Sequence, residues 1–315
     1  MAKKAIHTTK YRTYLCEQNE SLIRLIEMFP GHLLNKSKLV YFLVELGISP
    51  DEKSAKQTIS ELRADKIVEE HQFLTSKVRF IALTRFSLTY LYGKNTPVND
   101  LTDAIFHHSM FISVYFEREV LPRLKKPIKG LVGARKSLLK GLGTTAFIPA
   151  SFANELYSSR PIKELVGEDP RTDKRGEGLN ATYNCPSLRS VLSRRVVLQF
   201  KSDSTGVRVI CYYFDLKNNR SARQFLEVLD IVMHYLDNAL TCNYRLDFII
   251  ATYDSRATEK FKANLKSLAL IRGVWKPSII TQYFGLNAWP EDVTVVFKAF
   301  DIKKQFYGGS KVNPF

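Results

Sequence analysis

The sequence predicts an α+β protein with two domains. Helical patterns followed by two short strand patterns fill the first hundred residues, strand and helix patterns alternate over the last third, and a basic region separates them. The 315 residues are enough for two hydrophobic cores. We therefore expect a basic arm over 1–20, a first domain over 21–92, a helical basic connector over 93–186 and a small α/β domain over 187–315.

The first domain begins with three helical patterns, each apolar on one face. The first pattern covers 22–29 and ends at Pro30-Gly31, and the second covers 36–46 and ends at Gly47. The third covers 54–68, with its apolar residues on one side and polar and basic residues on the other. Three consecutive amphipathic helices of this length predict a small helical core.

A strand pair follows these helices. Two apolar stretches, 70–74 and 78–83, lie on either side of Thr75-Ser76-Lys77, which predicts a short β-hairpin with a basic tip. Three helices followed by a hairpin is the order of a winged helix-turn-helix, a DNA-binding fold. In that fold the third helix enters the major groove and the hairpin touches the flanking backbone.

Polar residues of the third helix and the hairpin are the candidates for DNA contact. Four of them share one side of the helix, within reach of base edges. Two more lie at the start of the helix, where amides and the helix dipole favour a phosphate, and two lie at or near the hairpin tip. In chain order the candidates are Lys53, Ser54, Lys56, Gln57, Ser60, Arg63, Lys77 and Arg79. The alternative is an ordinary solvated face, because acidic residues share this helix.

The charge of the whole chain favours a polyanionic partner. The formal net charge is +16, the isoelectric point is near 9.6, and the excess is spread along the chain. Nucleic acid is the partner we expect first, and an anionic membrane surface is second. A charge that serves solubility alone remains an alternative.

The connector holds the strongest run of positive charge. Residues 118–140 contain eight Lys or Arg and a single acid, interleaved with apolar residues. We expect contacts with the DNA backbone from Lys125, Lys126, Lys129, Arg135 and Lys136. A basic amphipathic helix on a membrane or an acidic partner, or a solvated surface, would carry the same pattern. The polar stretch 167–186 predicts a long flexible loop.

The last domain is expected to form a small sheet flanked by helices. Strand patterns at 195–200, 207–214 and 246–252 alternate with helical patterns at 221–240 and 257–270, and 293–297 is a candidate edge strand. The sheet also fits a degenerate restriction-nuclease-like domain. Under that alternative Asp203 and Asp215 would hold Mg²⁺ and Lys217 would orient the attacking water.

Several other classes of protein lack support. The four cysteines are far apart, which argues against zinc sites and disulfides, and the six histidines form no metal-ligating pattern. The chain contains no phosphate-binding glycine loop, no signal peptide and no apolar run long enough to cross a membrane. We expect a cytoplasmic protein that needs no metal or other cofactor.

Three stretches resemble the replication-relaxation family, winged-helix proteins of plasmids and other bacterial mobile elements. Leu83-Thr84 with Leu91 resembles the family's motif after the wing, with Ser87 where glycine is usual. His107-His108 begins a helix similar to the next one in the family. The segments around Asp215 and 246–253 resemble its C-terminal portion, although the usual Pro-Asp is absent. The resemblance implies DNA binding tied to replication or transfer of a mobile element.

The expected function is therefore double-stranded DNA binding in replication initiation, replication control or DNA transfer. A winged-helix transcriptional regulator is the alternative from the same class of protein, and a Mg²⁺-dependent nuclease is the enzymatic one. Further partners under this hypothesis are a second copy of the chain and other replication or transfer proteins.

Overall fold

The computed structural model is a mixed α/β protein that divides into two compact units. The first comprises 1–142 together with 304–315, and the second comprises 143–303. The described residues are 8–73, 78–93, 100–123, 146–148, 196–203, 206–216, 224–225, 228–229, 231–233, 235–236, 244–271 and 293–307. Each unit has its own sheet.

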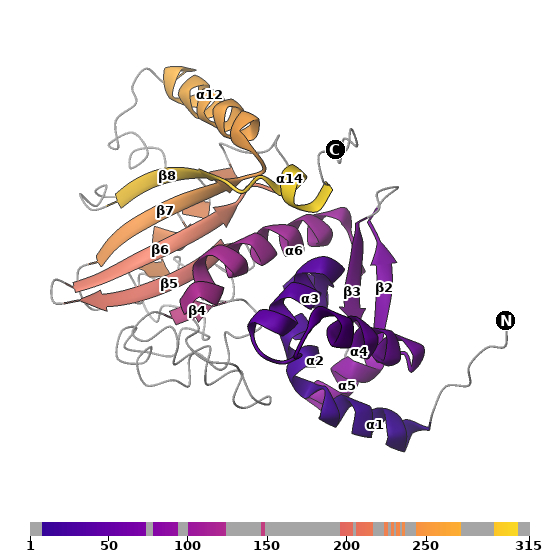
Figure 1. Cartoon of the computed structure of the whole chain (residues 1–315). Coiled ribbons are helices and arrows are strands. Elements are labelled where there is room, and N and C mark those ends of the chain that lie inside the picture. The colour runs from indigo at the N-terminus through magenta and orange to yellow at the C-terminus, as the bar shows by residue number, and fades with distance from the viewer. Residues whose placement is uncertain are drawn as a thin grey trace, which may run out of the picture. The chain divides into compact units, whose positions relative to one another are not determined.

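The first unit combines six helices with a three-stranded sheet in its described part (Figure 1). The helices are α1 (Thr9–Gln18), α2 (Glu20–Glu27), α3 (Lys36–Glu45), α4 (Glu52–Ala64), α5 (Arg85–Tyr92) and α6 (Asp103–Tyr115). The strands are β1 (Leu33–Asn35), β2 (Val68–Gln72) and β3 (Arg79–Leu83). Three short helical turns complete it: η1 (Pro30–His32), η2 (Phe116–Val120) and η3 (Leu121–Arg123). The three predicted helices correspond to α2, α3 and α4, and the predicted strand pair to β2 and β3.

Local sequence signals explain where these helices begin and end. The Asn35 side chain accepts a hydrogen bond from the Lys38 amide at 3.1 Å and so caps the start of α3. Asp51 caps α4 in the same way, through the Ser54 amide at 2.8 Å. Gly31 and Gly47 both have positive φ, which lets the chain turn sharply after α2 and after α3.

The sheet of the first unit is antiparallel, in the order β1-β3-β2. Strand β1 is only three residues long and was not predicted. It pairs Leu33 with Ala82, and its carbonyl at Leu33 accepts a hydrogen bond from Ser109 of α6 at 2.6 Å. Helix α4 buries Ala55, Ile59 and Leu62, which leaves its opposite face at the surface.

The second half of the predicted basic, partly ordered arm over 1–20 forms helix α1. Cys16 of this helix is fully buried. The Arg12 guanidinium lies 3.8 Å from the centre of the Phe86 ring and donates a hydrogen bond to the Lys66 carbonyl at 3.0 Å. Arg12 therefore attaches α1 to the rest of the first unit.

The second unit contains a five-stranded mixed sheet in the order β4-β5-β6-β7-β8. Its strands are β4 (Ala146–Ile148), β5 (Val196–Asp203), β6 (Gly206–Phe214), β7 (Tyr244–Thr252) and β8 (Val293–Ala299). The first three are antiparallel, whereas β6, β7 and β8 are parallel. Helix α12 (Ser255–Ile271) connects β7 to β8. The predicted strands and the predicted helix at 257–270 are confirmed.

The end of the chain belongs to the first unit. Helix α14 (Ile302–Tyr307) crosses the boundary between the two units. The Lys38 ammonium of α3 donates to Gln305 at 3.2 Å and also pairs with Glu117. Tyr307 donates to the Met110 sulfur at 3.9 Å. The first unit is thus discontinuous in sequence. No helix within the described ranges is long and apolar enough to span a membrane.

Candidate nucleic-acid interface

The surface side of α4 carries the four residues that were predicted to contact bases. Lys56, Gln57, Ser60 and Arg63 are all exposed, as is Lys53 at the helix start, while the apolar side of the same helix faces the core. The Lys56 side chain is 59% exposed and the Arg63 side chain 48% exposed. These side chains are therefore accessible to a ligand on the first unit.

Two of these residues already have partners within the helix. The Lys56 ammonium lies 2.8 Å from the Glu52 carboxylate, and the Gln57 amide donates to Glu61 at 3.0 Å. Exposed pairs four residues apart contribute only about 0.3–0.5 kcal/mol. Exchanging them for contacts with a ligand therefore costs little.

The predicted phosphate site at the start of α4 is not available in the form expected. Both Asp51 carboxylate oxygens face Ser54: one accepts from its amide at 2.8 Å and the other from its hydroxyl at 3.2 Å. The backbone hydrogen bond from Ser54 lowers the pKa of the Asp51 carboxyl. The Asp51 carboxylate thus already occupies this helix end, so we no longer expect Ser54 to bind a phosphate. Lys53 remains exposed beside it.

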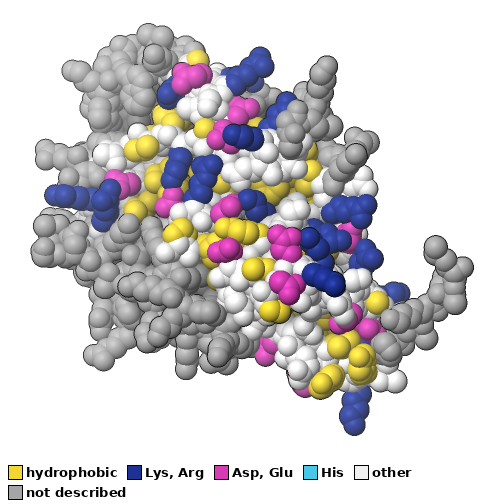
Figure 2. All heavy atoms as spheres, in the orientation of Figure 1, with side chains coloured by type: hydrophobic (Ala, Val, Ile, Leu, Met, Phe, Trp, Pro, Cys, Tyr) yellow, Lys and Arg dark blue, Asp and Glu magenta, His cyan; other side chains and the backbone are white. Residues whose placement is uncertain are grey.

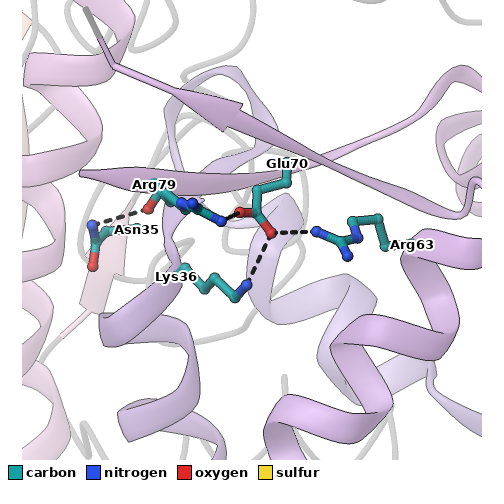
Figure 3. A network of polar contacts seen from close by, with 5 residues as sticks. All are labelled: Asn35, Lys36, Arg63, Glu70 and Arg79. Carbon is teal, nitrogen blue, oxygen red and sulfur yellow. Dashed lines mark hydrogen bonds and ion pairs between the residues drawn. The ribbon is translucent and has the colours of Figure 1, made fainter. Parts of the chain in front are cut away.

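Beyond the other end of α4, three cations meet on one carboxylate (Figure 3). Glu70 of β2 is bonded to Lys36 of α3 at 2.9 Å, to Arg63 of α4 at 2.8 Å and to Arg79 of β3 at 2.7 Å. We call these four residues the Glu70 cluster. The cluster joins four elements of the unit, α3, α4, β2 and β3, and its formal charge is +2.

The hairpin register explains why Glu70 meets Arg79. Glu70 pairs with Ile81 and Gln72 pairs with Arg79, so Glu70 and Arg79 are diagonal neighbours on one face of the hairpin. The Glu70 side chain is only 11% exposed. Burial raises the pKa of this carboxyl, but hydrogen bonds from Lys36 and Arg79 and the charges of Lys36 and Arg63 outweigh it and lower the pKa to about 2. Glu70 is ionised at any physiological pH.

A second polar side chain, that of Asn35, also links α3 to β3 beside the Glu70 cluster. Asn35, which caps α3, also donates from its amide to the Arg79 carbonyl at 3.1 Å (Figure 3). Only 5% of Asn35 is exposed, so both of its hydrogen bonds are at least partly buried. The start of α3 and the start of β3 are therefore held together beside the cluster.

In the described part of the first unit, positive and negative charges are nearly balanced. Its described residues between 8 and 123 include thirteen Lys or Arg against fourteen Asp or Glu. Figure 2 shows basic and acidic side chains next to one another on the face that it displays. The summed charge of these described residues is close to zero and does not favour a polyanion. DNA binding by them would therefore depend on specific contacts at α4 and at the Glu70 cluster.

Part of the predicted interface falls outside the described residues. Lys77 of the hairpin tip lies there, as do the basic residues of the connector, Lys125, Lys126, Lys129, Arg135 and Lys136, and the loop 167–186. They remain predictions.

The nuclease hypothesis required two carboxylates close together, and the sheet separates them. Asp203 pairs with Gly206 at the hairpin between β5 and β6, whereas Asp215 follows Phe214 at the far end of β6. Nine residues of extended chain place their backbones about 30 Å apart. One Mg²⁺ ion cannot bind both residues, so this proposed pair is wrong. Lys217 lies outside the described residues. The described part of the chain holds no cluster of three metal-ligating side chains.

The motif at the end of β3 has a structural role in this chain. The Thr84 hydroxyl donates to the Lys66 carbonyl at 2.8 Å, and the buried Ser87 hydroxyl donates to the Ile67 carbonyl. Both carbonyls belong to the turn between α4 and β2, where Lys66 has a positive φ of 54°. These hydrogen bonds stabilise the turn that sets the direction of β2, and therefore the position of Glu70.

Two members of the Glu70 cluster were not predicted as functional residues. Lys36 was assigned only to the second helix, and Glu70 only to a strand. The available signal in the sequence was an acidic residue, Glu70, at the start of the predicted strand 70–74. It lies between the basic candidates Arg63 and Arg79 along the chain. No family model, curated protein or solved structure matches the chain. The function must therefore be argued from this surface.

Proposed function

We propose that this protein binds double-stranded DNA selectively through a winged helix in its first unit. The arrangement of α2, α3 and α4, followed by the β2–β3 hairpin and joined by the short strand β1, supports this fold. In such a fold the third helix, here α4, lies in the major groove. The single observation that carries the proposal is the exposed polar side of α4 next to a cationic cluster on the hairpin.

The residues divide by the part of DNA that suits their chemistry. Gln57 and Ser60 have neutral hydrogen-bonding groups suited to base edges, and a glutamine amide matches adenine. Lys53 and Arg79 lie on either side of them and suit backbone phosphates. Arg63, in the last turn of α4, can reach either a guanine edge or a phosphate.

The biological role we assign is initiation or control of replication, or transfer, of a plasmid-like element. It rests on the resemblance to the replication-relaxation family. A transcriptional regulator would use the same surface. The position of the bound site separates them: an array of repeated sites favours replication, and a site overlapping a promoter favours transcription control.

The test begins with selection of duplexes from a random pool by the full-length protein, followed by affinity measurements. Gln57→Ala should weaken binding to the selected duplex about tenfold, or 1.4 kcal/mol, and leave binding to random duplex unchanged. Gln18→Ala is the matched control, because Gln18 is also exposed but lies at the end of α1. Failure to enrich any sequence, or equal effects of the two variants, would refute the proposal.

A further inference from the structure

Glu70 lies at a point where α3, α4 and the hairpin share a polar contact (Figure 3). Exposure increases outward from it: Glu70 is 11% exposed, Lys36 33%, Arg63 48% and Arg79 59%. The carboxylate is therefore the base of the cluster, and the two guanidinium groups are its outer surface.

We propose that Glu70 determines DNA specificity by positioning Arg63 and Arg79 and by restraining their attraction for any phosphate. This inference rests on the proposed function and adds to it a residue that makes the surface selective. Glu70 is a positioning residue, because it acts on DNA through its basic partners.

The donor geometry supports this role. Each arginine donates to Glu70 through one terminal nitrogen, Nη1. A guanidinium has five N–H donors, so each arginine retains donors for a base edge or a phosphate while its orientation is held. Long basic side chains lose substantial rotamer freedom when ordered, and Glu70 imposes that order before DNA arrives.

The charge balance supports the second part of the proposal. Without the carboxylate, three cations would stand together with a formal charge of +3. Such a cluster attracts the phosphates of every duplex equally. With Glu70 the local charge is +2, so sequence-independent attraction is weaker and the contacts that need correct geometry decide the binding.

The neighbouring residue offers a matched control. Glu69 lies on the other face of β2 because successive side chains of a strand alternate. It is 47% exposed and pairs with His71 at 3.4 Å. Glu70→Gln and Glu69→Gln remove the same charge at neighbouring positions. A difference in DNA selectivity between the two variants therefore reflects the Glu70 cluster and cannot be caused by net charge.

The experiment measures binding of the full-length protein to a selected duplex and to a random duplex over a range of salt concentrations. For Glu70→Gln we expect affinity for random duplex to rise about threefold and selectivity to fall about tenfold. For Glu69→Gln we expect unchanged selectivity. General misfolding would lower both affinities, so a rise for random duplex reports the proposed mechanism.

Equal selectivity in the two variants would overturn the inference while leaving the proposed function intact. If the wild type selects no sequence, the proposed function fails and this inference fails with it. Should Glu70→Gln not fold, Glu70→Asp keeps the charge but withdraws the carboxylate by one methylene. It should also lose selectivity, and unchanged selectivity in Glu70→Asp would overturn the role.

Discussion

Replacing Glu70 by glutamine should destabilise the protein at neutral pH and have little effect in acid. The pKa of the Glu70 carboxyl falls from its ordinary value of 4.5 to about 2 in the folded protein. At 1.36 kcal/mol per pH unit, this corresponds to at most about 3.4 kcal/mol of stability. The arginine partners are about half exposed, and solvent screening reduces the expected loss to about 2 kcal/mol.

The sign of the pH dependence follows from the lowered pKa. The ionised carboxylate stabilises the folded state fully above pH 4.5, and this contribution is lost as the pH falls towards 2. Glutamine does not titrate. The stability difference between wild type and Glu70→Gln should therefore shrink from about 2 kcal/mol at pH 7 towards zero near pH 2.

Urea unfolding followed by helical ellipticity at several pH values measures this difference. Tryptophan fluorescence is less suitable, because both tryptophans, Trp275 and Trp289, fall in the sequence of the second unit. Glu69→Gln is the control and should differ little from wild type at any pH. Equal stability of wild type and Glu70→Gln at pH 7, or a loss that persists undiminished at pH 3, would refute the reasoning.

Three further predictions follow from the same structure. Asn35→Ala removes a helix cap and a hydrogen bond to β3, and should lower the free energy of unfolding by about 2 kcal/mol, measured by thermal unfolding. A loss below about 0.5 kcal/mol, the low end for a helix cap, would contradict this role. Lys53→Ala should lower the salt slope of DNA binding by about 0.9, whereas Lys262→Ala on α12 should leave it unchanged. Wild type and Asp215→Asn should both leave duplex DNA uncut in Mg²⁺, since Asp203 lies opposite the first residue of β6 and Asp215 follows its last residue. Cleavage abolished by Asp215→Asn would contradict this.

The elements that could be predicted are those with a strong periodic pattern or a clear apolar run. Helix α4 alternates buried and exposed residues with helical spacing, and β6 and β7 contain the apolar runs 209–214 and 248–251. Helix α1 was missed because its apolar residues do not gather on one side. Strand β1 was missed because three residues are too few to show a strand pattern.

The Glu70 cluster was beyond prediction because it depends on tertiary packing and on register. Lys36 and Glu70 are 34 residues apart, and only the packing of α3 beside the hairpin brings them together. Arg79 reaches Glu70 because the hairpin pairs Gln72 with Arg79, and a shift of one residue would turn Glu70 to the other face.

The error in the nuclease hypothesis has a related cause. The spacing of Asp203 and Asp215 across a turn suggested that they lie close together. In an antiparallel pair, however, the end of the second strand lies beside the start of the first strand, not beside its end. The residues opposite the end of β6 therefore begin β5, near Val196.

The most direct test of the central claim is site-specific photo-cross-linking to DNA. A photoreactive amino acid at Ser60 would lie in the middle of the exposed side of α4, and one at Glu259, whose side chain is 73% exposed on α12, serves as the control. We expect the Ser60 probe to cross-link to bases of a selected duplex and the Glu259 probe to give no cross-link. Stable DNA binding without a cross-link from Ser60, or with equal cross-linking from both positions, would contradict the assignment of α4 as the DNA-contacting helix.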